Sequence, residues 1–172
     1  SVTGSVAAGG SPVISTSVSS LTGFNYLYAN GPSNYQTFTV DGSNLSAAVS
    51  ISGSINYEVS SDHVTFGATA SIGGAATLTA VPVYVRLKAG LSGGTYNTEN
   101  LTLSSGAATP VNVVCSGTVT PPTINLSPTS LSSFFALAGS PSPSTEKSFT
   151  VSGTNVAGNI TVTAPTNYEI ST

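Results

Sequence analysis

Apolar residues take every second position along much of this chain, and this alternation constrains the fold more than any other feature. The clearest run covers residues 81–88, where Val or Leu fills each odd position and Pro, Tyr, Arg and Lys fill the even ones. Shorter runs of the same kind cover residues 38–40, 49–51, 57–59, 64–66 and 111–119. Such alternation indicates strands with one buried face, and no window shows the spacing of an amphipathic helix. The pattern therefore predicts an all-β sandwich made of many short strands.

Clusters of turn-forming residues separate these runs. Gly, Pro, Ser, Asn and Asp gather at residues 31–34, 41–44, 73–74, 92–94 and 104–106. Gly and Asn accept the left-handed backbone of tight turns, and Pro presets the backbone angle at the start of a turn. We therefore expect these clusters to lie in turns between strands.

A long internal repeat sets the organisation of the chain. Residues 35–61 read YQTFTVDGSNLSAAVSISGSINYEVSS, and residues 146–172 read EKSFTVSGTNVAGNITVTAPTNYEIST. Phe38 corresponds to Phe149, an offset of 111 residues. Upstream, residues 12–24 (PVISTSVSSLTGF) match residues 122–134 (PTINLSPTSLSSF) with an offset of 110 residues. Because an immunoglobulin-like sandwich has about 100 residues, this period predicts tandem immunoglobulin-like repeats.

The repeat divides the chain into three parts. Residues 1–6 (SVTGSV) resemble residues 114–119 (VCSGTV), so residues 1–10 are predicted to be the last strand of a preceding repeat with its linker. Residues 11–120 are predicted to form one complete repeat, and residues 121–172 the first half of a second one. A half-sandwich has open sheet edges and an uncovered apolar face.

That uncovered face is the predicted assembly surface. Its residues are Ile124, Leu126, Phe149, Val151, Ile160, Val162 and Ile170, and the strand at the start of the chain adds Val2 and Val6. Two explanations fit the half-repeat. The chain is a window on a longer array whose adjacent repeats complete it, or a neighbouring copy supplies strands by strand complementation. In the second case the head-to-tail interface does not close, and a filament forms.

The scarcity of charge limits the chemistry that this chain can perform. Charged residues are 5% of the sequence, with 3 basic residues and a net charge of −3, against about 25% charged residues in ordinary domains. This argues against nucleic acid and anionic membranes as partners, and no apolar run reaches the ~18 residues needed for membrane insertion. One His, one Cys and six scattered carboxylates form no catalytic or metal-binding pattern, so we expect no enzyme activity and no cofactor. The Ser/Thr/Gly/Asn-rich surface indicates an extracellular protein.

Four strings of the sequence carry a family resemblance. They are PTINLSPTSLSSF (122–134), FTVSGTNVAGNITVTAPTNYEIS (149–171), VYVRLKAGLSGGTYNTENLTLSSGAAT (83–109) and VNVVCSGTV (111–119). Together they resemble the immunoglobulin-like repeats of large secreted surface proteins of Bacteroidetes, which the type IX system exports. The resemblance implies an immunoglobulin-like fold, tandem copies and a stalk, spacer or adhesin role.

These observations lead to one main functional hypothesis and one alternative. The main hypothesis is a non-enzymatic extracellular stalk or filament subunit. Its repeats are joined by Pro-containing linkers at 10–12 and 120–122, and its partners are copies of itself or adjacent repeats. The alternative is an adhesin module that binds a glycan or protein ligand through exposed tyrosines in its loops. The candidate ligand contacts are Tyr26, Tyr28, Tyr84 and Tyr96, together with Tyr35.

The remaining polar candidates have ordinary structural interpretations. We interpret His63 as an exposed turn residue, since the chain has no second His to share a site. Cys115 has the parity of a buried strand residue and is predicted to be an inert thiol, with an intermolecular disulfide as the alternative. Arg86 and Lys88 are predicted to meet Glu58 or Glu99. Residues 41–44 are read as a turn rather than a calcium loop, because their counterpart at 152–155 has no carboxylate.

Overall fold

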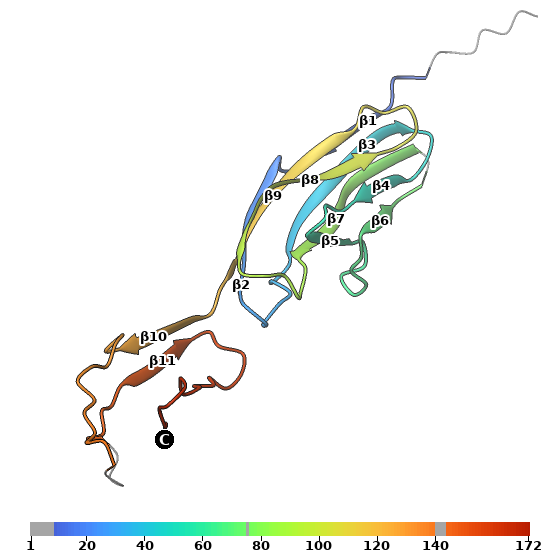
Figure 1. Ribbon diagram of the computed structural model, residues 1–172. Helices are drawn as coiled ribbons and strands as arrows, with labels where there is room; N and C mark the ends of the chain where they lie inside the picture. Colours follow the sequence, from blue (N-terminus) through green and yellow to red (C-terminus); the bar gives the residue numbers. More distant parts are fainter. Residues whose placement is uncertain (1–8, 75, 140–143) are drawn as a thin grey trace, which may run out of the picture. The chain divides into compact units, whose positions relative to one another are not determined.

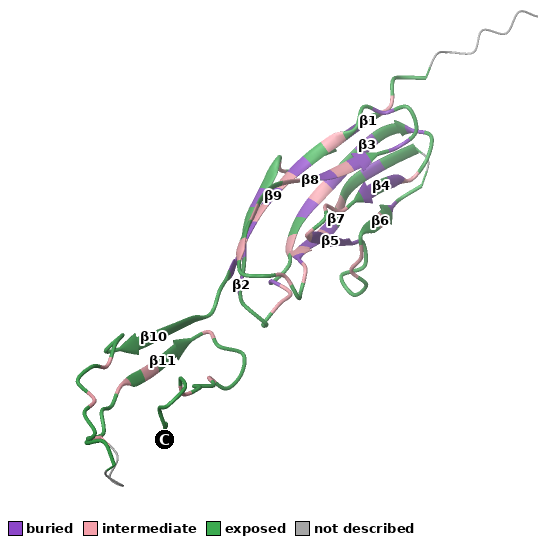
Figure 2. Cartoon of the chain, in the orientation of Figure 1, coloured by how far each residue is buried: buried purple, intermediate pink, exposed green. Residues whose placement is uncertain are grey.

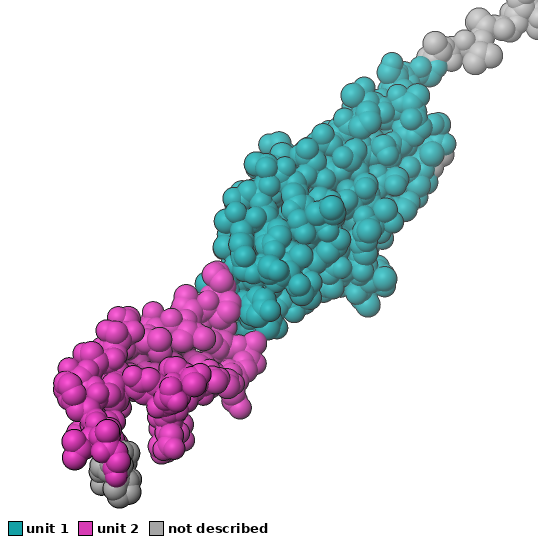
Figure 3. All heavy atoms as spheres, viewed as in Figure 1, with its two compact units in different colours: residues 1–120 teal, residues 121–172 magenta. Residues whose placement is uncertain are grey.

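The computed structural model describes residues 9–74, 76–139 and 144–172. The chain divides into two compact units, residues 1–120 and residues 121–172 (Figure 3). Residues 1–8, which include Val2 and Val6 of the predicted assembly surface, lie outside the described part. Within the described part every regular element is a strand, so the predicted all-β class is confirmed. No described helix is long and apolar enough to cross a membrane.

The first unit is a sandwich of two sheets (Figure 1). One sheet contains, in order, β1 (Val13–Thr16), β3 (Gln36–Leu45), β7 (Ala76–Leu87) and β5 (Tyr57–Ser60). The other contains, in order, β2 (Ser20–Leu27), β9 (Val111–Thr120), β8 (Gly94–Ser104), β4 (Val49–Ser52) and β6 (Thr69–Ile72). Neighbouring strands run antiparallel, apart from the parallel pair β2 and β9.

The core of the first unit lies between these sheets. Val83, Val85 and Leu87 of β7 are fully buried, and so are Leu101 and Leu103 of β8. Figure 2 shows the buried positions recurring along the strands of this unit. Removing a Val or Leu side chain from water stabilises the fold by about 1.5–3 kcal/mol. The alternation at residues 81–88 is therefore the core-facing pattern of one strand.

Two local predictions are wrong. Residues 41–44 do not form a turn, because β3 continues through them with two register shifts between Val40 and Leu45. Such a bulge accommodates the left-handed Asn44, at φ 54°, without reversing the chain. Residues 64–66 lie in a loop rather than a strand, and Val64 is 82% exposed.

The second unit repeats one strand pair of the first. Its strands β10 (Thr123–Ser127) and β11 (Thr150–Thr154) pair antiparallel, with Ile124 opposite Gly153. In the first unit β1 and β3 pair with Ile14 opposite Gly42, which is the equivalent register. The sequence repeat is thus also a structural repeat over these two strands.

Candidate assembly surface and aromatic cluster

The apolar side chains of the second unit lie open. None of the described residues of this unit is buried. Tyr168 is 50% exposed and Ile170 is 40% exposed, whereas their counterparts Tyr57 and Val59 are fully buried. Of the predicted assembly residues in this unit, Ile124, Leu126, Val162 and Ile170 are exposed, and Phe149, Val151 and Ile160 are half-buried.

These side chains line an open hollow of about 1610 Å³, with Leu126, Phe134, Val151 and Tyr168 among its walls. A small-molecule pocket is usually about 300–1,000 Å³. The hollow exceeds this range and is lined by residues whose counterparts form a core. It therefore has the character of one half of a sandwich interior. We call this lined face the open face of the second unit.

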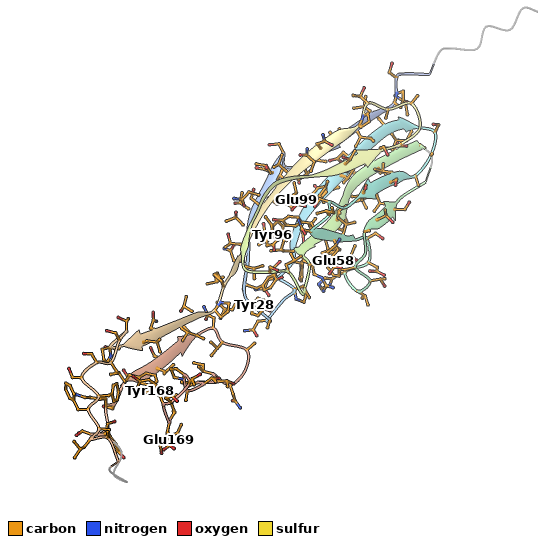
Figure 4. All side chains as sticks on the ribbon, in the orientation of Figure 1. Tyr28, Glu58, Tyr96, Glu99, Tyr168 and Glu169 are labelled. Atoms are coloured by element: carbon orange, nitrogen blue, oxygen red, sulfur yellow. The ribbon has the colours of Figure 1, made fainter. Side chains whose placement is uncertain are left out.

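The motif Asn56-Tyr57-Glu58 shows how the same face is covered in the first unit. The Asn56 side-chain amide donates to Glu99 Oε1 at 2.6 Å, and the Asn56 backbone N–H donates to Glu99 Oε2 at 3.1 Å. The Glu58 carboxylate accepts from Arg86 Nε at 2.6 Å. The partner residues come from β7 and β8, and Figure 4 marks Glu58 and Glu99.

The central residue of this motif anchors the core. The Tyr57 ring packs edge-to-face on Phe24, with centroids 5.2 Å apart. Its hydroxyl donates to the Tyr96 carbonyl oxygen at 2.7 Å. Burial raises the pKa of Tyr57 well above its usual value, and Cys115 and Glu99 add to this rise. The hydroxyl therefore stays protonated and remains a donor.

The second unit carries the same motif and the same ring pair. Asn167-Tyr168-Glu169 corresponds to Asn56-Tyr57-Glu58. Phe134 and Tyr168 pack edge-to-face at 5.3 Å, as Phe24 and Tyr57 do. The second unit thus positions the central ring of the motif while its apolar face lies open.

A second feature is an aromatic cluster on the outer side of the first unit. His63 stacks on Tyr84 with centroids 4.8 Å apart, and Tyr35 lies edge-on to both rings at 4.3 and 5.6 Å. His63 is exposed as predicted, but it is not solitary, because the loop after β5 carries it across to β7. We call Tyr35, His63 and Tyr84 the aromatic cluster.

A tight turn holds His63 in this cluster. Asp62 Oδ1 accepts hydrogen bonds from the Val64 and Thr65 backbone N–H groups and from the Ser60 hydroxyl. These bonds, with that from Thr65 the largest influence, hold the pKa of Asp62 well below its usual range. His63 itself has a left-handed backbone at φ 67°. The turn therefore fixes the ring by backbone geometry.

Charged and apolar groups adjoin the aromatic cluster on the same sheet. Arg86 follows Tyr84 by two residues on β7, and its guanidinium lies 3.9 Å from the centre of the Phe66 ring. It also pairs with Glu58, which confirms one of the predicted contacts. Lys88 instead donates to the Ile55 carbonyl oxygen at 2.7 Å.

The other predicted ligand-contact tyrosines do not join this cluster. Tyr26 is buried, which corrects its predicted exposure, because its hydroxyl donates to the Lys88 carbonyl oxygen at 2.6 Å. Tyr96 is half-buried and donates to the Ser92 carbonyl oxygen at 2.8 Å. Tyr28 is exposed. Of the predicted set, only Tyr84 and Tyr35 come together, and His63 was missed because nothing in its sequence neighbourhood signals the approach to β7.

Cys115 is a fully buried free thiol, as predicted. Burial, and secondly the nearby Glu99, raise the pKa of Cys115 to about 12. The thiolate, which is the reactive form, is therefore scarce at neutral pH. Among the described residues no three His, Cys, Asp or Glu side chains gather as metal ligands.

Comparison with known proteins adds no family to these observations. No protein-family model matches the chain. No curated protein matches it either. The functional argument therefore rests on the repeat, the open face and the aromatic cluster.

Proposed function

We propose that this chain is a non-enzymatic extracellular structural module, a stalk or filament subunit built of tandem immunoglobulin-like sandwiches. The observation that carries the proposal is the shared register of β1–β3 and β10–β11. Two segments about 110 residues apart adopt the same pairing, which is what a tandem array of one domain type requires.

The strand order of the first unit supports the immunoglobulin-like part of the proposal. The order β1-β3-β7-β5 parallels the A-B-E-D sheet of that fold, and β9-β8-β4 parallels its G-F-C sheet. The strands β2 and β6 extend the second sheet at its two edges. The resemblance of the sequence strings to repeats of Bacteroidetes surface proteins points the same way.

The path of the chain also supports a stalk. The chain enters the first unit beside β1 and leaves it after β9 at the other end (Figure 1). Such a path lets identical sandwiches follow one another lengthwise. The residues after β9 are Pro121 and Pro122, and proline stiffens a linker.

In the filament form, copies join when strands of a neighbour cover the open face of the second unit. The scarcity of Lys and Glu assists this, because charged side chains are a usual guard against edge pairing. It also leaves few charges to desolvate at a contact between copies.

Electron microscopy of the native material and of the purified chain tests the proposal. We expect rods or fibres with a regular repeat, and isolated compact particles would overturn it. For the filament form, Val162→Asp with Ile170→Asp should abolish fibres of the purified chain. The matched control is Val64→Asp, an equally apolar and exposed position in the first unit, which should leave them intact.

A second candidate function is ligand binding by an adhesin module, and the aromatic cluster favours it. The repeat does not account for Tyr35, since its counterpart in the second unit is Glu146. Exposed aromatic groups next to an Arg are typical of binding sites. A glycan array probed with the chain tests this candidate. Binding should fall at least about tenfold in Tyr35→Ala with Tyr84→Ala and stay unchanged in Tyr28→Ala, and equal binding by all three proteins excludes the cluster.

A further inference from the structure

We propose that the open face of the second unit is a docking surface for a β-hairpin that presents an arginine and a glutamate. The hairpin has the chemistry of β7 and β8, and it comes from a repeat of this same type. The inference rests on the proposed function, because it treats the two units as copies of one domain.

The first step is the retention of the whole motif. The chain holds only six acidic residues, yet a Glu recurs after Asn-Tyr at both Glu58 and Glu169. In the first unit each motif residue has its partner on β7 or β8. A recurring Asn-Tyr-Glu therefore implies recurring partners: a carboxylate for Asn167, a carbonyl for the Tyr168 hydroxyl and a guanidinium for Glu169.

The second step is the register in which these partners arrive. In the first unit Tyr57 lies opposite Leu87, Glu58 opposite Arg86 and Val59 opposite Val85. By the repeat, the docked strand places a Leu opposite Tyr168, an Arg opposite Glu169 and a Val opposite Ile170. This is a Val-Arg-Leu sequence that faces Asn-Tyr-Glu-Ile in antiparallel order.

The third step is the state of the receiving surface. The Phe134–Tyr168 ring pair already has the geometry of its buried counterpart. The half-buried Val151 corresponds to Val40, which lies opposite Val81 of β7. The ring pair and β11 therefore give the incoming hairpin a preformed apolar surface and a strand edge.

Charge decides the kind of occupant. Glu169 stands between the apolar Tyr168 and Ile170, so a lipid surface would have to desolvate its carboxylate without a partner. A hairpin that carries an arginine pairs this carboxylate and covers both apolar neighbours at once. The hollow, at about 1610 Å³, is also larger than a small ligand fills.

The test adds a synthetic polypeptide of residues 76–104, which carries β7 and β8, to the isotopically labelled full chain. We expect saturable NMR shift changes and amide protection at residues 149–154 and 168–170. Saturable binding without protection at residues 168–170 overturns the proposed register, and no binding overturns the inference.

A charge exchange tests the arginine. Glu169→Arg in the chain should weaken binding about fivefold, and Arg86→Glu in the polypeptide should restore it. The matched control is Glu146→Arg, which makes the same charge change outside the motif and should have a smaller effect. Equal weakening by both variants, or no rescue, overturns the arginine assignment.

This outcome is independent of the microscopy. Fibres without hairpin binding overturn only the present inference. Hairpin binding with isolated compact particles overturns only the stalk or filament function.

Discussion

The two units use closely similar sequence and reach different degrees of burial. Tyr57 and Val59 are fully buried in the first unit, and Tyr168 and Ile170 are 50% and 40% exposed in the second. The local features agree: the registers match, and Asn44 and Asn155 have φ values of 54° and 56°. The difference teaches that local sequence sets the strand pair and its bulge, while β7, β8 and β9 supply the other half of the core.

The sharpest way to break this comparison is to truncate the central tyrosine in each unit. Tyr57→Ala should lower the free energy of unfolding of the first unit by about 3–5 kcal/mol, because it empties a fully buried site. Tyr168→Ala should cost at most about 1 kcal/mol, because its ring is half open to water. Urea denaturation followed by circular dichroism measures both, and equal losses would contradict the comparison.

Thiol labelling reports on the first unit alone, because Cys115 is the only cysteine. Its pKa of about 12, against an ordinary value of 9.0, leaves about a thousandfold less thiolate in the folded state. The reaction with a thiol reagent at pH 7 should therefore be slower by about that factor in buffer than in urea. Fast labelling of the native chain would show that the core of this unit opens.

Glycine substitutions compare the packing of the two units. A Cβ on Gly117 would collide with the Phe24 carbonyl oxygen and lie 3.0 Å from the Tyr57 hydroxyl, so backbone must move. Gly117→Ala should destabilise the first unit by about 1–3 kcal/mol. A Cβ on Gly153 meets only side-chain ends of Ile160 and Val156, at 2.9 Å and beyond. Gly153→Ala should cost less than about 1 kcal/mol by the same denaturation assay, and the reverse order would contradict the packing difference.

The smallest expected effect is a pH dependence confined to the first unit. The pKa of Asp62 is lowered in the folded state, so its carboxylate stabilises that state above the ordinary pKa of 3.8. This stabilisation is lost as the pH falls from there through the folded value. Asp62→Asn should reduce the loss of stability between pH 6 and pH 3, measured as the urea midpoint. Glu146→Gln, in the second unit, should leave that midpoint unchanged, and an equal shift would rule out the turn as the cause.

Sequence patterns predicted the strands best where many residues share one face. Residues 81–88 alternate over a long run, and β7 contains most of them. The reading of residues 41–44 as a turn failed, because a bulge and a turn use the same residue types and only the partner strands distinguish them. The strand predicted at 64–66 failed because three residues of alternation do not outweigh the Asp62 turn.

The candidate sites show the same division. Repetition alone identified the apolar residues of the open face, since their counterparts had the pattern of a core. It did not identify the aromatic cluster, because His63 and Tyr84 lie on different elements that meet only in the folded sheet. Tyr26 was misplaced for a related reason: its acceptor, the Lys88 carbonyl oxygen, is distant along the chain.

The sequence by itself determined the all-β class and the repeated strand pair of this protein, because alternation and turn chemistry act between residues close along the chain. Only the tertiary structure decided which repeated side chains are buried and which rings gather on the surface. Burial depends on the strand that arrives from elsewhere. The same Asn-Tyr-Glu motif is covered where β7 and β8 bring Arg86 and Glu99, and its Tyr168 lies half open in the second unit.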